Sequence, residues 1–441
     1  MCKHGGARAA PVRHPPERRL RRTGRVFSLA LTLVVAHPAR AEEPQRPLDL
    51  AMALTLARRS SSPALDAARR RIDEARGELA FASAILPENP ELVVGAGPRF
   101  LDPGASGDRL GLEAGLSQRL EVAGQRGHRM GRGRAQVAAA EAELKVTARA
   151  LDLAVAIGFW QALTAGERAR IAREHEGLAR ELLEIATARF ERGAASPVEA
   201  NGARIRLAEA SRRSARSEAE ARAAAVRLAP LCGLDPARPP ALGGSLPSPS
   251  PSLPTLGAEA LAYRPEVASA AARTRGANAA SDLADASAWP DVRLGVRYAT
   301  EEGSRALLGQ LSVGLPLFQR NQGERERARA AAARAEAEER GVRAQVAADA
   351  EEARLEAARA RDALALYDAE VLGSMEENLS LLRRMLEAGK ISASEVIVLQ
   401  RELLEGRLGY LDARLEVALA DARVRSAAGL PIAEDSNGGA R

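Results

Sequence analysis

Two very long stretches without proline constrain this chain more than any other feature of its sequence. Residues 127–192 and 323–388 contain no proline, and both are rich in Ala, Leu, Glu and Arg. As a helix, each stretch would be about 99 Å long at a rise of about 1.5 Å per residue. A helix of that length needs neighbours along its whole length. The chain is therefore predicted to form coiled coils or a helical cylinder.

The composition supports long helices over several compact domains. Only 3% of the residues are aromatic, whereas 28% are charged. Because aromatic rings supply much of the buried area of globular cores, such a chain is poorly equipped to build several of them. Abundant Ala, Leu, Glu and Arg is typical of coiled coils and long helices.

The chain repeats itself at a spacing of 196 residues. Gly127 and Gly323 stand 196 positions apart, and RGAASPVEA and AGKISASEV share that offset. The other pairs at this offset are Gly193 with Gly389, Ser196 with Ser392, Glu199 with Glu395, and Gly233 with Gly429. Several anchors at one spacing indicate a duplication. Each half is predicted to run helix, two strands, very long helix, turn and helix.

The repeat predicts the domain boundaries. The first repeat spans residues 42–234, with a β-hairpin at about 91–121 and a long helix at about 127–192. The second spans 256–433, with a β-hairpin at about 291–318 and a long helix at about 323–388. Between them, 235–255 is a Pro/Ser/Gly-rich linker whose composition predicts extended chain that contributes to no core. The tail 434–441 is predicted to be disordered.

The first 41 residues are predicted to be a cleaved signal peptide. The basic run RRLRRTGR, the short apolar run VFSLALTLVVA and the small-residue site ARA stand in the order of a secretory signal. The rival reading is a buried helix of the mature protein.

The first 41 residues also carry most of the excess positive charge. They hold nine of the 64 Lys and Arg residues and one of the 58 acids, so the rest of the chain is nearly neutral. A nucleic-acid partner is therefore not expected.

The predicted strands have one apolar and one polar face. In the second strand Leu110, Leu112, Ala114 and Leu116 alternate with Gly111, Glu113, Gly115 and Ser117, and DVRLGVRYAT and LLGQLSVGL repeat this pattern. Strands of about ten residues with this alternation are typical of outer-membrane barrels. Four strands cannot close a barrel, yet every edge must be paired in lipid. Several copies are therefore expected to share one barrel.

In this order, the motifs resemble the TolC-like outer-membrane efflux channels, in particular the heavy-metal branch with CzcC and CusC. The resemblance covers essentially the whole mature chain. It rests on LDLAMALTLARRSSSPAL, on LPENPELVVG, on GLSQRLEVAGQRG with its partner LSVGLPLFQRNQG, and on the two G-x-x-S turns. It implies a mainly α fold with a small β portion, in which duplicated long-helix hairpins form an α-helical periplasmic barrel. It also implies a homotrimer with a twelve-stranded β-barrel in outer-membrane lipid.

The resemblance also implies partners and sites. A periplasmic adaptor (membrane fusion protein) and an inner-membrane pump, with the RND type favoured, would complete the conduit, and heavy-metal cations are the expected cargo. The turns with Gly193, Ser196, Gly389 and Ser392 would lie at the periplasmic tip where the adaptor docks. Glu395, with Glu199 and Lys390, is the candidate for the periplasmic gate. The alternative is structural, because the serines and glutamates also fit S-x-x-E capping boxes.

Three further expectations concern chemistry. Glu113, Arg293 and Arg297 are candidates for the barrel lumen, with solvated charges at loop ends as the alternative. His128, His175 and Cys232 offer no metal-ligand spacing, so no metal site and no cofactor are expected. The sequence contains no P-loop, HExxH, GxSxG or dinucleotide motif, so an enzyme is not expected. The competing overall hypothesis is a periplasmic coiled-coil scaffold or adaptor without a membrane barrel.

Overall fold

The structure is a computed structural model that describes residues 47–59, 62–98, 110–248, 264–301, 304–387 and 393–432. The predicted signal peptide and the predicted disordered tail lie outside the described residues. The chain divides into two compact units, Met1–Gln45 and Arg46–Arg441. All described elements belong to the second unit.

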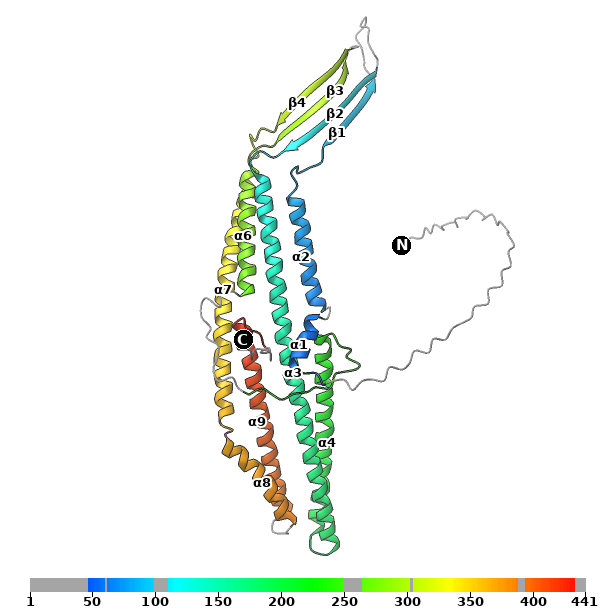
Figure 1. The fold of residues 1–441 in the computed structure, drawn as a ribbon, viewed down its shortest axis with the longest axis vertical. Helices are drawn as coiled ribbons and strands as arrows, with labels where there is room; N and C mark the ends of the chain where they lie inside the picture. The colour runs from blue at the N-terminus through cyan, green and yellow to red at the C-terminus, as the bar shows by residue number, and fades with distance from the viewer. Residues whose placement is uncertain are drawn as a thin grey trace, which may run out of the picture. The chain divides into compact units, whose positions relative to one another are not determined.

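The same order of elements occurs twice within the second unit (Figure 1). The first half contains α1 (Leu50–Arg59), α2 (Pro63–Ala82), β1 (Glu91–Pro98), β2 (Leu110–Leu120), α3 (Gln125–Glu191), α4 (Pro197–Leu228) and the 3-10 helix η1 (Ala229–Cys232). The second half contains α6 (Pro265–Ala286), β3 (Val292–Glu301), β4 (Ser304–Val313), α7 (Gln322–Ala365), α8 (Ala369–Glu387) and α9 (Ala393–Ala427). The predicted fold class, mainly α with a small β portion, is confirmed.

The four strands form one antiparallel sheet in the order β1-β2-β3-β4. The central pair, β2 with β3, joins the first half of the chain to the second, with Leu116 opposite Val296. Strands β1 and β4 are the two edges within the described part of the chain. Each edge strand therefore presents backbone N–H and C=O groups without a ladder partner in one copy of the protein.

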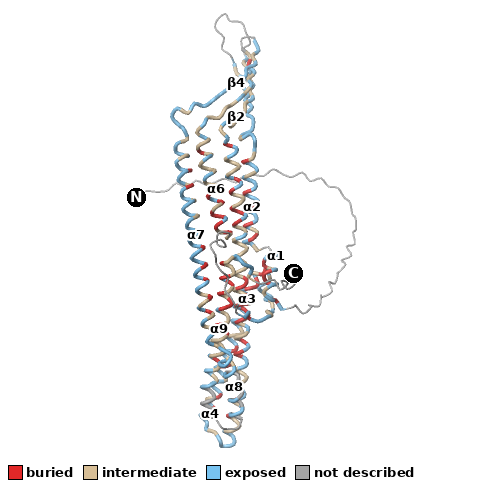
Figure 2. Tube along the Cα trace, turned by 60° about the vertical axis from the view of Figure 1, so that its left-hand side comes forward, coloured by how far each residue is buried: buried red, intermediate tan, exposed pale blue. Residues whose placement is uncertain are grey.

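The helices that adjoin the sheet lie side by side. Helix α3 packs between α2 and α6, and α7 packs on the other side of α6. Farther from the sheet, α4 packs on α3, and α9 packs on both α7 and α3 (Figures 1 and 2). Each half thus supplies one antiparallel helical hairpin, and α3 with α9 joins the two hairpins.

The main core lies along the middle of α3, where α1, η1 and α9 meet it (Figure 2). Val155 and Phe159 of α3 are 0% and 2% exposed, and the Phe159 ring contacts that of Trp160 edge to face at 5.1 Å between centroids. Helix α3 also contains the one stretch, among the described residues, that is long and apolar enough to cross a membrane. Helix α3 packs on five other helices, α1, α2, α4, α6 and α9, which is the environment of a core helix.

A second core is built almost entirely from alanine. It joins α7 to α9 through Ala350, Ala353, Ala357 and Ala360 on one side and Val417, Ala420, Val424 and Ala427 on the other. Because alanine side chains are short, the two helix backbones approach closely. The alanine-rich sequence is thus explained by helix-on-helix packing rather than by helix propensity alone.

The prediction that the Pro/Ser/Gly-rich linker contributes to no core is wrong. Leu246 is 5% exposed and belongs to the main core, and Leu242 pairs with Leu48 in an isolated parallel bridge. The backbone N–H of Leu48 donates to Ala241 O at 2.8 Å, and that of Gly243 donates to Leu48 O at 3.0 Å. Leu242 and Leu246 thus fasten the linker, whereas Pro236, Pro239 and Pro247 are exposed.

The prediction of one unbroken helix over 323–388 is also wrong. Helix α7 ends at Ala365 and α8 begins at Ala369. The Asp368 carboxylate accepts a hydrogen bond from the Val371 N–H at 2.8 Å, which caps a new helix. The Tyr367 ring turns toward α9, where it lies 5.6 Å from the Tyr410 ring. The first long stretch does form the single 67-residue helix α3.

The repeat is visible in the backbone at corresponding positions. The residue before α3, Gly124, has φ +78°, and the residue before α7, Asn321, has φ +57°. Gly233 and Gly429, 196 residues apart in the sequence, have φ +69° and +78° where each half ends. Left-handed backbone favours glycine and tolerates asparagine, so these residue types follow from the turns that they make.

Candidate functional site

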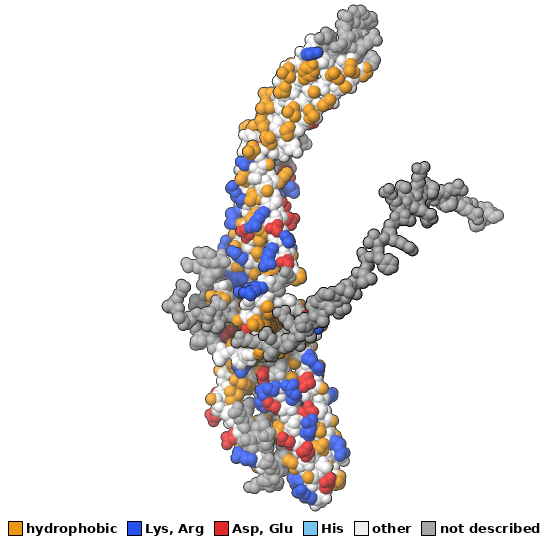
Figure 3. Space-filling model, turned by 45° about the vertical axis from the view of Figure 1, so that its right-hand side comes forward, with side chains coloured by type: hydrophobic (Ala, Val, Ile, Leu, Met, Phe, Trp, Pro, Cys, Tyr) orange, Lys and Arg blue, Asp and Glu red, His pale blue; other side chains and the backbone are white. Residues whose placement is uncertain are grey.

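The sheet has one mainly apolar face, on which the register also places the polar residues Gln118, Thr300 and Arg305. Residues paired across antiparallel strands share a face, so the register assigns every side chain to one side. The apolar face carries Leu92, Val94, Ala96, Leu112, Ala114, Leu116, Val292, Leu294, Val296, Tyr298, Leu307, Leu311 and Val313. Most of the large ones are exposed; Leu307, for example, is 72% exposed. Figure 3 shows apolar side chains covering this part of the molecule, whereas charged side chains dominate over the helices.

The opposite face of the sheet is mainly polar, apart from residues such as Val93 and Leu308, and carries cross-strand ion pairs. The Arg293 Nη1 donates to Glu91 Oε2 at 2.7 Å and reaches Ser117 Oγ at 3.4 Å. The Arg297 Nη1 donates to Glu113 Oε1 at 3.2 Å. The structure therefore brings the three predicted lumen residues together on one face, within the strands rather than at loop ends. Because these side chains are 41–59% exposed, the pairs contribute little to stability, but they neutralise local charge.

Glycines surround the ion pairs on the polar face. The register places Gly95, Gly97, Gly111, Gly115 and Gly295 on that face. A Cβ on Gly115 would lie 3.8 Å from Arg297 Cγ, so the arginine side chain passes over the glycine backbone. The absence of side chains at these positions leaves the polar face shallow between the charged pairs.

The sequence missed part of this polar face. Glu91, the partner of Arg293, is the first residue of β1 and lies on the same face of the strand as Gly95. Arg119 binds Glu88 and Asp291, where β2 meets the start of β3. The Gln125 Nε2 adds a hydrogen bond of 3.0 Å to Asp291 Oδ1. The alternation assigns Glu91, Arg119 and Asp291 to the polar face, but their partners depend on the strand register.

The tip of the first hairpin is a capped turn. Gly193 follows α3 with φ +74°, which allows the chain to reverse. The Ser196 Oγ accepts a hydrogen bond from the Glu199 N–H at 3.3 Å and so caps α4, as predicted from the sequence. The Glu199 side chain is half-buried in the first turn of α4.

The tip of the second hairpin is described only in part. Glu395 is the third residue of α9, and only its backbone is described. Gly389, Lys390 and Ser392 lie outside the described residues. The structure thus places Glu199 and the Glu395 backbone each in the first turn of the returning helix, in agreement with the repeat.

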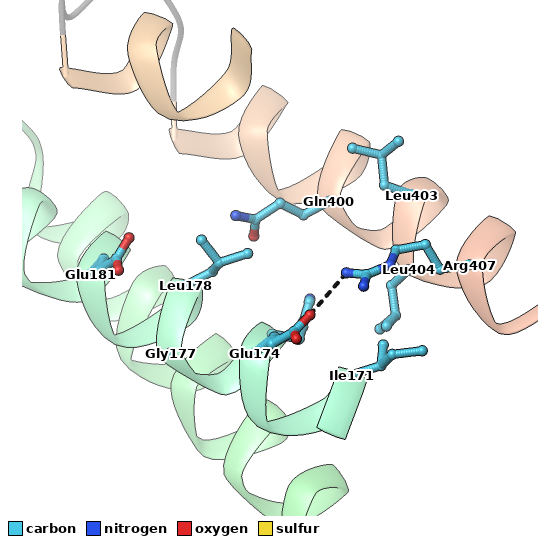
Figure 4. A pocket seen from close by; sticks show the side chains of 10 residues that line it. Ile171, Glu174, Gly177, Leu178, Glu181, Gln400, Leu403, Leu404 and Arg407 are labelled. Carbon is cyan, nitrogen blue, oxygen red and sulfur yellow. Dashed lines mark hydrogen bonds and ion pairs between the residues drawn. The ribbon is translucent and has the colours of Figure 1, made fainter. Parts of the chain in front are cut away.

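A cavity of about 260 Å³ separates the two hairpins between α3 and α9 (Figure 4). Across it the Arg407 Nη1 donates to Glu174 Oε2 at 3.1 Å, and Arg168 pairs with Asp412 nearer the sheet. Leu178 and Leu404 supply apolar walls. These two ion pairs are polar links between the first and the second hairpin.

His175 lies in the wall of the same cavity, and its Nδ1 has no hydrogen-bond partner. Burial lowers the pKa of its imidazole below the usual value, and the nearby Arg213 guanidinium lowers this pKa further. The histidine is therefore neutral at neutral pH. Hydrogen bonds from Ser214 and Ser211 lower the pKa of Glu176, the residue after His175.

Metal-binding groups do not gather in the described part of the chain. No group of three or more His, Cys, Asp or Glu side chains is arranged there to hold a metal ion. Cys232 is 1% exposed in the main core, and burial raises the pKa of its thiol to about 11. Its thiol therefore stays protonated, in the role of a small core residue.

The comparison with protein families decides the identity. The model of the family described as outer membrane efflux protein matches residues 56–234 and 256–430. The chain belongs to the outer membrane efflux protein family. The TolC-like resemblance inferred from the sequence motifs is thereby confirmed, and this outer membrane efflux protein is a channel protein of the outer membrane that extends into the periplasm. The competing hypothesis of a scaffold without a membrane barrel is set aside.

Individual proteins support the assignment. The cobalt-zinc-cadmium resistance protein CzcC of Cupriavidus metallidurans is 27% identical over 377 residues, which cover 85% of this chain and 88% of CzcC. The structure of CusC matches with a TM-score of 0.71 at 18% identity and covers 86% of this chain and 92% of its own. The CmeC outer membrane channel of Campylobacter jejuni matches with a TM-score of 0.71 at 15% identity and covers 88% and 87%. These two structures support the fold of the outer membrane efflux protein.

Proposed function

We propose that three copies of this protein form the passive outer-membrane exit duct of a tripartite efflux system for heavy-metal cations. A periplasmic adaptor and an inner-membrane pump of the RND type deliver the cargo. The observation that carries the proposal is the sheet: it is apolar on one face, polar on the other and open at both edges.

The open edges support closure between copies. In lipid an unpaired backbone N–H or C=O group is costly, so β1 and β4 must both find partners. A sheet of four strands is too narrow to close on itself, whereas three copies supply the twelve strands that the family resemblance implies. The apolar face then meets lipid, and the face with Glu113, Arg293 and Arg297 lines the lumen.

The charges on the polar face favour a duct of low selectivity. Glu91 pairs with Arg293 and Glu113 with Arg297, so the lumen formed by these strands carries little net field. Selection by charge therefore belongs to the other end, where a threefold ring of Glu395 would attract cations. The cargo assignment rests on the likeness to CzcC, whose name records cobalt, zinc and cadmium.

The remaining parts of the proposal concern the tip and the ends of the chain. The turns at Gly193 and Gly389, with Ser196 and Ser392, form the adaptor-docking tip, and Glu199 and Lys390 lie beside the gate. Residues 1–41 are removed as a signal peptide, and the two repeats are joined by the linker 235–255. The proposal assigns no catalytic residue and no cofactor.

A pair of lysine substitutions tests the two faces. Val296→Lys on the apolar face should abolish the heat-modifiable trimer in outer-membrane fractions, because a lysine facing the middle of the bilayer costs about 2–4 kcal/mol. Gln310→Lys, on the polar face of β4, should leave the trimer intact. If both variants lose the trimer, or if neither does, the assignment of the lipid and lumen faces is contradicted.

Growth assays test the cargo. Deleting the gene should sensitise the cells to cobalt, zinc or cadmium, and the wild-type gene should restore resistance. A deletion strain with unchanged metal tolerance but increased sensitivity to organic toxicants would contradict the metal assignment while leaving the channel function in place.

A further inference from the structure

Exposed apolar segments stand at both edges of the sheet, at the end nearer the helices. Before β1, the side chains of Phe81, Ile85 and Leu86 are 76%, 79% and 41% exposed. After β4, those of Leu315, Leu317 and Phe318 are 75%, 65% and 87% exposed. Neither 81–87 nor 314–319 contains a charged residue. These two stretches are named the entry segment and the exit segment.

The strand order determines where these segments meet in a closed barrel. Strand β1 starts, and β4 ends, at the same end of the sheet, because the four strands alternate in direction. When β4 of one copy pairs with β1 of the next, the same alternation continues around the ring. The exit segment of one copy then lies beside the entry segment of its neighbour.

The centre of the sheet shows how such a junction is built. The pair β2–β3 has the same relation as β4 has to the neighbour's β1: the second strand of one repeat beside the first strand of another. There Arg119 and Gln125 both bind Asp291, so polar groups tie the two strands. The turn that leads into the long helix is the same in both repeats. Before α3, Gln125 Oε1 accepts a hydrogen bond from Ala123 N–H at 2.8 Å, and before α7, Gln322 Oε1 accepts one from Arg320 N–H at 2.7 Å.

The outer junction has apolar residues where the inner one has charge. The position that Arg119 holds near the end of β2 falls, at the repeat spacing, on Leu315 after β4. An arginine there would face the neighbour's Glu91, but Glu91 already pairs with Arg293 of its own copy. The arginine tie of the inner junction thus has no counterpart at the outer one, where Leu315 and its apolar neighbours take its place.

We propose that the exit segment of each copy packs against the entry segment of the next and forms an apolar clasp below every barrel seam. The occupant of each exposed segment is a second copy of this chain. The clasp rests on the proposed trimer and specifies what holds its subunits together beyond the strand ladder. It is continuous with the seam between β4 and the neighbour's β1, so it closes the junction where the edge strands leave the membrane.

Chemical cross-linking tests the clasp in the full-length protein in outer-membrane vesicles. The background carries Cys232→Ala, which removes the remaining cysteine of the mature chain. Phe318→Cys combined with Ile85→Cys should give covalent dimers and trimers with a short bismaleimide. The control combines Phe318→Cys with Ile205→Cys, because Ile205 is 60% exposed but lies on α4 in the hairpin distant from the sheet. We expect at least a tenfold excess of cross-linked product over this control.

The outcomes separate the clasp from the trimer itself. A native trimer without cross-linking above the control would overturn the clasp and leave the proposed function standing. High oxygen accessibility of a nitroxide at position 318 in that trimer would identify lipid as the occupant, which also overturns the clasp. A protein that is monomeric by native mass measurement, with wild-type helicity, would refute the trimer and the clasp together.

Discussion

Two glycines on the polar face of the sheet provide a matched test of the register between the two repeats. Gly115 in β2 and Gly295 in β3 share a face and lie on adjacent strands. A Cβ on Gly295 would lie 3.0 Å from the Leu116 carbonyl oxygen and 3.1 Å from Ser117 Cβ. On Gly115 it would meet nothing closer than 3.7 Å. The same added methyl group therefore has opposite consequences at the two positions.

The magnitudes follow from the contacts. Adding a methyl group to a tight site costs about 1–3 kcal/mol, because the backbone of β2 must move away from β3. Replacing glycine within a strand returns about 0.5–1 kcal/mol of conformational entropy. Gly295→Ala should therefore destabilise each copy by about 1 kcal/mol, whereas Gly115→Ala should stabilise it by about 0.5 kcal/mol.

The assay is the temperature at which the barrel loses its heat-modifiable mobility on gels, measured for both variants beside the wild type. Gly295→Ala should shift this temperature down by a few degrees, and Gly115→Ala should leave it unchanged or raise it. Far-UV circular dichroism at 20 °C serves as the control for overall folding. If Gly295→Ala melts at or above Gly115→Ala, the β2–β3 register is refuted.

Three further predictions concern the helical part. Glu395→Ala should reduce cation preference in single-channel recordings, and unchanged reversal potentials would reject the acid ring. Gly193→Val should loosen the first tip, because a β-branched residue at φ +74° costs about 1–2 kcal/mol or more. The loosening should appear as faster proteolysis between α3 and α4. Gly193→Asn should be tolerated, and equal cleavage of the two variants would contradict the left-handed turn at Gly193. The lowered pKa of His175 means that the unfolded chain takes up the proton first, so stability falls as the pH drops below about 6.5. His175→Gln should weaken this acid sensitivity in thermal unfolding between pH 7 and pH 5, and identical pH profiles would show that His175 is not its source.

Much of the fold follows from local patterns that a single sequence contains. The absence of proline and the Ala-, Leu-, Glu- and Arg-rich composition predicted α3, and period-two alternation predicted both hairpins. Ser196 was recognisable as a helix cap from its position before Pro197 and Glu199. These features depend on neighbours in the sequence, so the sequence alone was sufficient.

The errors arose where distant parts of the chain meet. The break after Ala365 needs Asp368 as a cap and the contact of Tyr367 with α9, and only the cap has a local signal. Leu246 looked like part of a polar linker, yet its burial depends on a gap between α3 and α9. In the same way, alternation placed Arg293 and Arg297 on one face, but the partners Glu91 and Glu113 follow only from the register.

The interruption at Tyr367 gives the two hairpins different mechanical properties. Helix α3 runs without a break from the end of β2 to the turn at Gly193, so bending at its far end is transmitted as strain to the sheet. On the other side, α8 can tilt about the joint at 366–368 while α7 keeps its alanine contacts with α9. A displacement at the far end of the second hairpin can therefore be taken up at this joint before it reaches β4.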